Sequence, residues 1–342
     1  MLKVDYIRDG LSEEFHTGLW VLAKPVKGFK PDESDTPFYL RSCAKPLQAT
    51  LLVDNKINLT SEELALCCSS HAGEDCHIKV ANKILKKFKL NDKMLKCGIV
   101  PPLSKSMQNM MIIREEEPTT LHNNCSGKHL GFLALCQEKD WDMLTYDQPN
   151  HPLQIAVKQK IDELCGVTQE YPMTTDGCGV PIVSMPLRNL VQGYMNLLNY
   201  PRILNAIKIN PYIFGGEGRT DTEIIKRTEN LIAKVGAGGL CVVLNVRERN
   251  AFAVKIHDAN MDARRFALYE IINRLGWGEL RYDNRIKTNS GKVVGQIVVS
   301  FYLNFGKVKY EKDFWNTDYF NHALFCCFCS KNQYCLNRRI RF

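Results

Sequence analysis

The spacing of apolar and polar positions divides the chain into strand-like ends and a helical middle. Near the N-terminus, β-branched and aromatic residues between turn-forming glycines predict a β-hairpin over residues 4–24. Runs of the same character predict two more strands, residues 240–246 and 251–256, around a turn at Glu248-Arg249-Asn250. A last helix is expected from Asp262 to Leu275, because the apolar spacing there ends at Gly276.

The middle of the chain shows apolar residues at helical spacing, with polar residues at the helix starts. One start, Thr60-Ser61-Glu62-Glu63, has the pattern of a capping box. Because strands at both ends enclose this part, we predict an α+β fold: one antiparallel sheet built from the N- and C-terminal strands, with a mostly helical insertion between them. The helices are expected at residues 45–55, 60–70, 76–89, 127–137, 151–164, 196–208 and 220–235.

Size and composition indicate an ordinary globular protein. The chain has 342 residues, 45% of them hydrophobic and 24% charged, enough for a sizeable core. No stretch approaches the ~18 apolar residues of a membrane span, and the first residues lack an apolar leader. We therefore expect a cytoplasmic protein without a membrane partner. The cysteines within apolar runs are expected to be small buried hydrophobic residues: Cys67, Cys68, Cys136 and Cys241.

The net charge of +8 is concentrated near the C-terminus. Residues 300–342 hold seven Lys and Arg against three Asp and Glu, which is half of the net charge in an eighth of the chain. A nucleic-acid-binding protein would show a basic module on a strongly basic body. Since the body here is close to neutral, no nucleic-acid partner is expected.

A first candidate for chemistry is the tetrad Ser42-Cys43-Ala44-Lys45. Serine becomes a nucleophile when a neighbouring base takes its proton, and lysine is such a base when burial or a nearby cation lowers its pKa. The tetrad precedes an apolar run, so Ser42 is expected at a helix N-terminus, where Lys45 shares its face and the amide dipoles favour an oxyanion. Taken alone, the tetrad fits a solvent-facing helix start better, because Ser-x-x-Lys is common by chance.

Two further polar segments follow apolar runs. In Cys68-Ser69-Ser70-His71-Ala72-Gly73-Glu74, which follows an apolar helix, Ser70 is either a second active-site hydroxyl or a helix stop. In Thr175-Asp176-Gly177-Cys178-Gly179, two glycines hold a carboxylate and a thiol on a tight turn. Carboxylates and thiols beside glycine are typical of functional sites.

The start of the 127–137 helix places a thiol, an amine and an imidazole together, since Cys125, Lys128 and His129 are three and four residues apart. The two asparagines before them are candidate helix caps. Cys125 and Cys178 are possible zinc ligands, but zinc sites need three or four donors. Lysine holds its proton to about pH 10.4, so spacing alone does not add Lys128. Two buried thiols are the simpler interpretation at this point.

Together these segments resemble the bacterial L-asparaginase II family of the Rhizobium etli inducible type, which is distinct from the threonine-nucleophile asparaginases. The family's motif order is kept over roughly residues 4–298, far more than one motif would match by chance. The segments that carry the resemblance are Arg41–Ala49, Cys67–Glu74, Leu95–Gly98 with Pro101-Pro102, His122–Gly131, Asp176–Pro181, Gly215–Asp221, Lys234–Gly239 and Lys255–Arg265.

The resemblance implies hydrolysis of L-asparagine to L-aspartate and ammonia by a homodimer. It also implies a fold like that of serine β-lactamases and glutaminases. On this basis residues 1–299 are expected to form a single catalytic domain. Residues 300–342 are expected to be a divergent basic tail, rich in cysteine and aromatic residues.

Two serine–lysine pairs lie together in the family's active site, and the resemblance places them on Ser42 with Lys45 and on Ser70 with Lys234. Ser42, deprotonated by Lys45, would attack the side-chain carboxamide. Backbone amides would hold the oxyanion, and water would then hydrolyse the acyl-enzyme. Since two nearby cationic amines lower each other's pKa, Lys234 is expected to keep Lys45 neutral.

The family's zinc is held by two cysteines and a lysine, which the resemblance places on Cys125, Lys128 and Cys178. This zinc is expected to position the substrate's α-amino and carboxylate groups rather than to supply a hydroxide, because the serines already provide the nucleophile. The expected substrate-binding residues are Arg41, His129 and Asp176.

One position departs from the family. Gly238 stands where the family has a glutamate, so a carboxylate is missing that could hold the loop that aims Lys234. Three alternatives also stay open. A serine acylase or β-lactamase would add Ser-Asp-Asn and Lys-Thr-Gly, yet Ser-Asp-Asn is absent and Lys287-Thr288 is followed by Asn289. A cysteine amidase would use Cys125 with His129. A non-catalytic, zinc-containing protein would bind asparagine without hydrolysing it.

Overall fold

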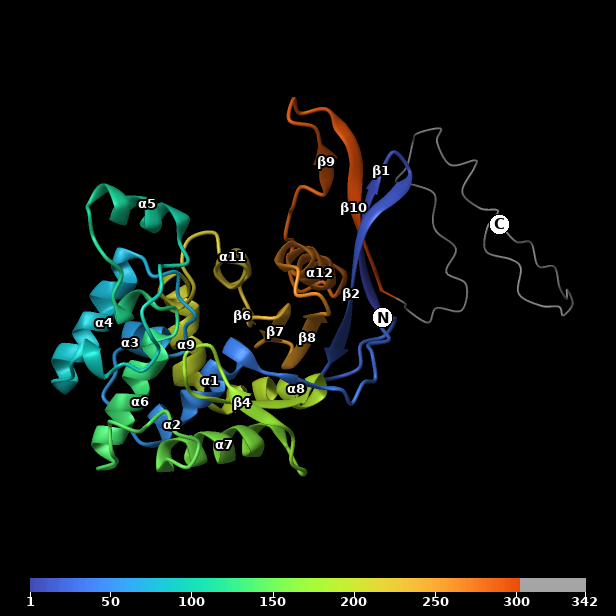
Figure 1. Ribbon diagram of the computed structural model, residues 1–342. Helices are drawn as coiled ribbons and strands as arrows, with labels where there is room; N and C mark the ends of the chain where they lie inside the picture. The colour runs from blue at the N-terminus through green and yellow to red at the C-terminus, as the bar shows by residue number, and fades with distance from the viewer. Residues whose placement is uncertain (302–342) are drawn as a thin grey trace, which may run out of the picture. The chain divides into compact units, whose positions relative to one another are not determined.

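The computed structural model describes residues 1–301 (Figure 1). Its main sheet has seven strands in the order β6-β7-β8-β2-β1-β10-β9. β1 and β2 precede the helical part and the other five strands follow it, and all neighbouring strands are antiparallel. The predicted α+β class, with a sheet made from both ends of the chain, is therefore confirmed. The predicted basic tail lies, from residue 302 on, outside the described residues.

The main sheet and a smaller sheet, with the order β3-β5-β4, contain all the strands of residues 1–301. The strands are β1 (Leu2–Arg8), β2 (Leu11–Leu22), β3 (Pro37–Tyr39), β4 (Met173–Thr175), β5 (Pro181–Pro186), β6 (Leu231–Val235), β7 (Leu240–Asn245), β8 (Asn250–Ile256), β9 (Arg285–Lys287) and β10 (Val293–Phe301). β1 and β2 form the predicted N-terminal hairpin, joined at Asp9-Gly10, where both residues have positive φ.

The helices lie mainly between β2 and β6. They are α1 (Lys45–Gln48), α2 (Thr50–Asp54), α3 (Ser61–Cys67), α4 (Asp75–Phe88), α5 (Lys105–Ile113), α6 (Ser126–Glu138), α7 (Pro152–Cys165), α8 (Leu187–Asn196), α9 (Pro201–Ile209), α10 (Pro211–Phe214), α11 (Thr220–Arg227) and α12 (Met261–Arg274), with 3-10 turns η1 (Arg41–Ala44), η2 (Asp92–Met94), η3 (Thr120–His122) and η4 (Leu197–Asn199). Within residues 1–301, no helix is long and apolar enough to cross a membrane.

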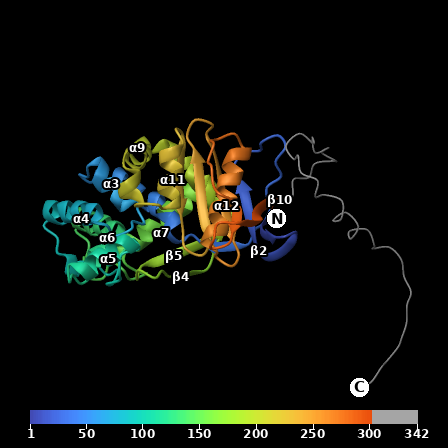
Figure 2. The ribbon, with the colours of Figure 1, turned by 90° about the horizontal axis from the view of Figure 1, so that it is seen from above.

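Helices cover both faces of the main sheet. On β7, Cys241 and Val243 point into a core shared with α12, while Val242 and Leu244 point into the core of the helical part, because side chains alternate along a strand. α8 packs against β2, β7 and β8, on the side of the helical core. The helical part and the sheet lie side by side in both views (Figures 1 and 2). The edge between them is where β6 meets η1.

Most of the predicted helices are present, but one expectation is wrong at a position that matters. The helix expected over residues 220–235 ends at Arg227, and Leu231–Val235 form strand β6. Short apolar runs do not distinguish strand from helix, and here pairing with β7 buries all five residues. α5 and α8 were not predicted, although α5 begins after Ser104, whose hydroxyl accepts from the Met107 amide, whereas α8 has no side-chain cap.

The buried cysteines and the capping box agree with the predictions. Cys67, Cys68, Cys136 and Cys241 are free and buried, and burial raises the pKa of each thiol. The hydroxyl of Thr60 accepts a hydrogen bond from the Glu63 amide, and the Glu63 carboxylate accepts one from the Thr60 amide.

Candidate active site

Ser42 and Lys45 lie on one short turn at the edge between sheet and helices. Ser42 is in the 3-10 turn η1, and Lys45 begins α1 directly afterwards. Residues three apart overlie one another in a 3-10 turn, so the two side chains share a face. Arg41, the first residue of the turn, has φ of 48°. A non-glycine residue in this region is strained, and such strain occurs often at functional sites.

The hydroxyl of Ser70 lies beside that of Ser42. Ser70 follows the end of α3, and the two Oγ atoms form a hydrogen bond of 3.2 Å. The side-chain amide of Asn124 donates to Ser70 Oγ at 2.8 Å, while its backbone carbonyl accepts from Lys45 Nζ at 3.1 Å. Asn124 therefore connects the second serine to the first lysine. We call Ser42, Ser70, Lys45, Asn124 and Lys234 the serine cluster.

Lys234 reaches this cluster from β6. Its side chain has no exposed surface, and its Nζ donates to the Val235 carbonyl at 2.8 Å. Nζ also lies 3.5 Å from a carboxylate oxygen of Asp221, which is equally buried. Within residues 1–301, neither Lys234 nor Lys45 hydrogen-bonds to a serine hydroxyl. A direct proton transfer to either amine thus requires the side chains to move into hydrogen-bond contact.

The surroundings of Lys234 make it a base. Burial lowers its pKa to about 8, against the opposing effect of Asp221 and with a smaller contribution from the positive charge of Lys45. The charge of Lys45 thus contributes to the lowered pKa of Lys234, while the reverse effect, that Lys234 keeps Lys45 neutral, stays a prediction. At neutral pH an appreciable fraction of this amine is unprotonated.

Close packing joins β6 to the turn that carries Ser42. The thiol of Cys43 donates to the backbone carbonyl of Lys234 at 3.2 Å. A Cβ atom added at Gly236 would lie 3.0 Å from Cys43 Sγ, so glycine allows this approach. Tyr194 of α8 donates to the Cys43 carbonyl at 2.8 Å and supports the turn from the other side. The Ser42 turn and strand β6 are thus held against each other.

A second group, which we call the thiol cluster, consists of Cys125, Lys128 and Cys178, and each residue is at most 5% exposed. Cys125 caps α6, Lys128 lies in its first turn, and Cys178 comes from the turn before β5. Lys128 Nζ donates to Cys178 Sγ at 2.9 Å. A hydrogen bond from Cys178 holds the pKa of the Cys125 thiol well below its usual value.

The thiol cluster fits the zinc that the family resemblance implies. Two sulfurs and a nitrogen converge in a buried space, and thiolate and nitrogen donors are those that zinc prefers. One thiol already favours its anionic form, which is the form that binds metal. Asp176 accepts a hydrogen bond from Cys178 at 3.7 Å, the kind of outer contact that orients a metal ligand.

Arg41 and Asp176 face each other between the two clusters. Arg41 Nε lies 2.8 Å from an Asp176 carboxylate oxygen, yet the two atoms are not aligned for a hydrogen bond. In the turn that carries Asp176, the Asp176 amide donates to the Val180 carbonyl and the Gly179 amide donates to the Asp176 carbonyl, and Gly179 takes a positive φ of 87°. Both charged groups keep capacity for a polar ligand.

His129, the third expected substrate-binding residue, is turned toward Tyr146. It is fully buried, and its Nδ1 lies 2.7 Å from the Tyr146 hydroxyl. Within residues 1–301 its Nε2 has no hydrogen-bond partner, and no hydrogen bond joins the His129 and Cys125 side chains. The Cys125–His129 pair that a cysteine amidase needs is therefore not formed.

Two site residues were not identified from the sequence. Asn124 was interpreted only as a candidate cap, although its amide bonds Ser70. Asp221 lies in the family segment Gly215–Asp221 without an assigned role, and it is the buried partner of Lys234. An unpaired aspartate at the start of a helix is usually explained by the helix dipole, so no local signal separated it from an ordinary first-turn acid.

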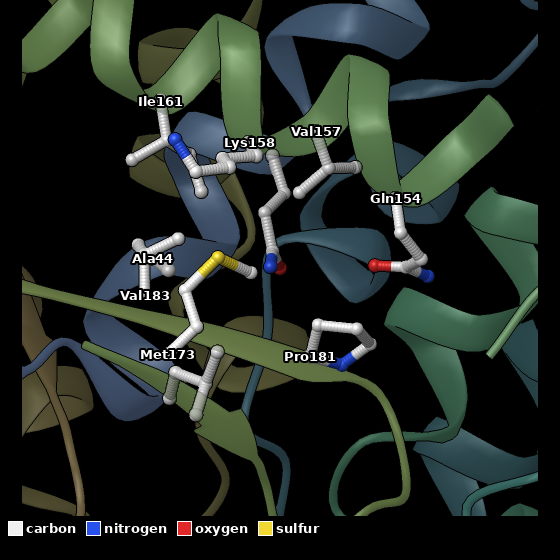
Figure 3. Close-up of a pocket in the computed structure, with 10 residues that line it drawn as sticks. Ala44, Gln154, Val157, Lys158, Ile161, Met173, Pro181 and Val183 are labelled. Carbon is white, nitrogen blue, oxygen red and sulfur yellow. The ribbon is translucent and has the colours of Figure 1, made fainter. Parts of the chain in front are cut away.

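A narrow pocket lies behind the Ser42 turn (Figure 3). α7 supplies Gln154 and Val157, and Met173 and Pro181 close it from the small sheet. Its volume is about 10 Å³, roughly the space of one water molecule. It is therefore too small for an amino-acid substrate, and the candidate active site is defined by the two clusters instead.

The chain was compared with curated protein sequences and with solved structures. No curated protein sequence matches it. Similar solved structures include a β-lactamase/D-alanine carboxypeptidase from Pseudomonas syringae, which is 13% identical, with 80% of this chain and 93% of that chain covered and a TM-score of 0.37. A D-alanine carboxypeptidase from Burkholderia cenocepacia is 14% identical, with 80% and 93% covered and a TM-score of 0.36. A β-lactamase from Mycobacterium bovis is 12% identical, with 81% and 95% covered and a TM-score of 0.35.

The sequence pattern of a known family covers nearly the whole of the described part. The family described as L-asparaginase II matches residues 4–299, which include every residue of the serine and thiol clusters. The chain belongs to the L-asparaginase II family.

Proposed function

We propose that this protein hydrolyses the side-chain amide of L-asparagine, releasing L-aspartate and ammonia. The observation that carries the proposal is the contact between the Ser42 and Ser70 hydroxyls, 3.2 Å apart, in a cluster with two buried lysines. Membership of the L-asparaginase II family supports the amide as substrate. A buried amine with a pKa of about 8 supports base-assisted attack by a serine.

In the proposed mechanism Ser42 Oγ attacks the carbon of the substrate carboxamide, and Lys45 takes the hydroxyl proton. Backbone amides at the start of the Ser42 turn hold the oxyanion. The tetrahedral intermediate loses ammonia, which takes its proton from the lysine, and leaves an ester on Ser42. Water then hydrolyses the ester, releasing L-aspartate and restoring the hydroxyl. Ser70 and Lys234 form the second pair and carry protons beside the first.

The remaining site residues bind the substrate in this proposal. Asp176 accepts from the α-ammonium group, and Arg41 and His129 contribute hydrogen-bond donors. Cys125, Lys128 and Cys178 hold zinc, which when bound supplies a Lewis acid that helps to orient the substrate's α-amino and carboxylate groups. The thiols next to Asp176 support this assignment.

The proposed zinc site can be tested without measuring enzyme activity. Metal analysis of purified protein is expected to find about one zinc per chain in the wild type and less than about 0.1 in Cys178→Ser. Cys165→Ser, a buried free cysteine on α7, is the matched control and should keep its metal. Equal zinc in both variants would place the metal elsewhere.

The function is tested by ammonia release from L-asparagine and L-glutamine. Wild type, Ser42→Ala and Ser70→Ala are compared with the exposed control Ser106→Ala. Loss of at least about 1,000-fold in kcat for Ser42→Ala supports Ser42 as nucleophile. Full activity of Ser42→Ala with loss in Ser70→Ala would exchange the two serines. A wild type that binds asparagine without releasing ammonia would be the binding protein, and one that hydrolyses penicillin instead would be a serine acylase.

Two further expectations complete the proposal. The protein is proposed to form a homodimer, which sedimentation velocity at several concentrations tests directly. It is also proposed to act in the cytoplasm, where fractionation of the cells that make it should find it.

A further inference from the structure

Arg219 is a cation beside the serine cluster that the mechanism above does not use. It follows the loop Gly215-Gly216-Glu217-Gly218 and immediately precedes α11. The loop packs against the segment that carries Ser70, since a Cβ atom at Gly216 would lie 2.4 Å from the Ala72 Cβ. Two glycines of the loop have positive φ, so its path depends on them.

The loop is also tied to that segment by hydrogen bonds. The amide of Glu217 donates to a Glu74 carboxylate oxygen at 3.3 Å. Arg219 Nη2 donates to the backbone carbonyl of Ser70 at 3.5 Å. The guanidinium group therefore contacts the backbone of the same residue that carries the Ser70 hydroxyl.

The guanidinium group of Arg219 makes few hydrogen bonds. A guanidinium group has five N–H donors, and within residues 1–301 Arg219 makes only the long bond to Ser70 and no ion pair. Its Nε is shielded from solvent and has no hydrogen-bond partner there. Of the nearby carboxylates, Asp221 pairs with Lys234, and Glu74 accepts from the Glu217 amide through one oxygen while its other oxygen has no hydrogen-bond partner within residues 1–301. The side chain is only partly buried, but its shielded Nε lacks a hydrogen-bond partner, so an anionic ligand would be stabilised here.

We propose that Arg219 binds the α-carboxylate of the amino-acid substrate. The inference rests on the proposed function and adds a specificity residue to it. The α-carboxylate carbon of asparagine is three bonds from the carboxamide carbon, so a carboxamide at Ser42 places its carboxylate a few ångströms away. A guanidinium group matches a carboxylate in a two-point hydrogen bond. Arg41 is less free for this role, because Asp176 already faces it.

The test compares two substrates that differ only in the carboxylate: L-asparagine and 3-aminopropanamide. Arg219→Gln is expected to raise KM for L-asparagine roughly 10- to 100-fold, as for a lost hydrogen bond to a charged group. Its kcat/KM for 3-aminopropanamide should stay within twofold of wild type. Arg227→Gln, at an exposed arginine that ends α11, is the control and should change neither value.

A merely structural role gives a different result. If Arg219→Gln lowers kcat/KM for both substrates equally, or leaves KM for L-asparagine unchanged, the inference is overturned. Arg219→Lys keeps the charge without the planar fork and is expected to recover part of the affinity.

Product binding separates this inference from the proposed function. Calorimetry with L-aspartate is run on Ser42→Ala and on Ser42→Ala with Arg219→Gln. Weaker binding by the double variant, at least tenfold, supports Arg219 even if wild type releases no ammonia from asparagine. Equal binding by the two would overturn the role of Arg219 while leaving asparagine hydrolysis standing.

Discussion

The serine and thiol clusters both bury a lysine, and their surroundings move its pKa in opposite directions. Burial opposes the charge of Lys128, but the neighbouring sulfurs of Cys178 and Cys125 outweigh it and raise the pKa. At Lys234 burial and the charge of Lys45 outweigh Asp221, and the pKa falls to about 8. Without bound metal Lys128 is therefore held as a cation, and it would have to lose its proton to bind zinc, whereas Lys234 in the serine cluster can act as a base.

The difference separates two tasks within one site. Proton transfer needs an amine that changes protonation near neutral pH, which the serine cluster contains. Holding a metal or a charged ligand needs soft donors and fixed charges, which the thiol cluster contains. The predictions below alter one cluster at a time.

The largest expected effect is the loss of Lys234, the second lysine of the serine cluster, which carries protons beside Ser42 and Lys45 in the proposed mechanism. Lys234→Met, together with Asp221→Asn to avoid an unpaired buried carboxylate, is expected to lower kcat by at least about 1,000-fold. Steady-state ammonia release measures it, with circular dichroism to confirm the fold. More than a tenth of wild-type activity in this double variant would remove Lys234 from the mechanism.

Asp221→Asn alone should act on stability in a pH-dependent way. Asp221 raises the pKa of Lys234, so its charge stabilises the folded protein below about pH 8 and the benefit is lost as the pH rises through that value. The variant is expected to lose about 3 kcal/mol of unfolding free energy at pH 6, as for a broken buried pair. At pH 9 the loss should be clearly smaller. Urea unfolding at both values measures this, and an equal loss at both would contradict the pairing.

The pH dependence of wild-type activity tests the titration of Lys234 directly. Because an amine must lose its proton to act, log kcat/KM is expected to rise with pH by about one unit per pH unit and to level off near pH 8. In Asp221→Asn the rise should move to lower pH, since the carboxylate that raises the pKa of Lys234 is gone. A profile that is flat between pH 6 and 9 would rule out Lys234 as the group that titrates.

The smallest effect is expected at the position that departs from the family. Gly238 is exposed in the turn between β6 and β7, with φ of 69°, and a Cβ atom there would meet nothing within 4 Å. Gly238→Glu is expected to cost about 1 kcal/mol of stability through the strained backbone. Its kcat should stay within twofold of wild type. A rise above fivefold would show that the missing carboxylate had weakened the site.

The departure at Gly238 matters if the loop after Lys234 aims the lysine side chain. Lys234 instead lies within a paired strand and is held by Asp221 and the Val235 carbonyl, and none of these contacts involves Gly238. The sequence pattern predicted a helix at Lys234 because five apolar-rich residues have no period of their own. Pairing with β7 across the short turn of residues 236–239 decides the structure there, and the apolar run of β6 does not by itself show that pairing.

The features that were predictable are local or are carried by the family motifs. Periodicity identified the N-terminal hairpin, strands β7 and β8 and the capping box at Thr60, since each depends on residues close in the chain. The contact of Ser42 with Ser70, 28 residues apart, followed from the resemblance and not from spacing. Arg219 and Asp221 gave no signal, because a buried charge is recognised by its surroundings and those come from the folded protein.

The sheet built from both ends of the chain has a consequence for biosynthesis. Residues 18–22 of β2 pair with 252–256 of β8, and Leu2 pairs with Phe301. Such contacts close very long loops and form slowly. A nascent chain that has released the Ser42 turn from the ribosome still lacks β6 and its lysine. The Ser42 turn therefore meets Lys234 only late in translation, and the sheet that holds β6 is complete only once β10, which ends at Phe301, has been made.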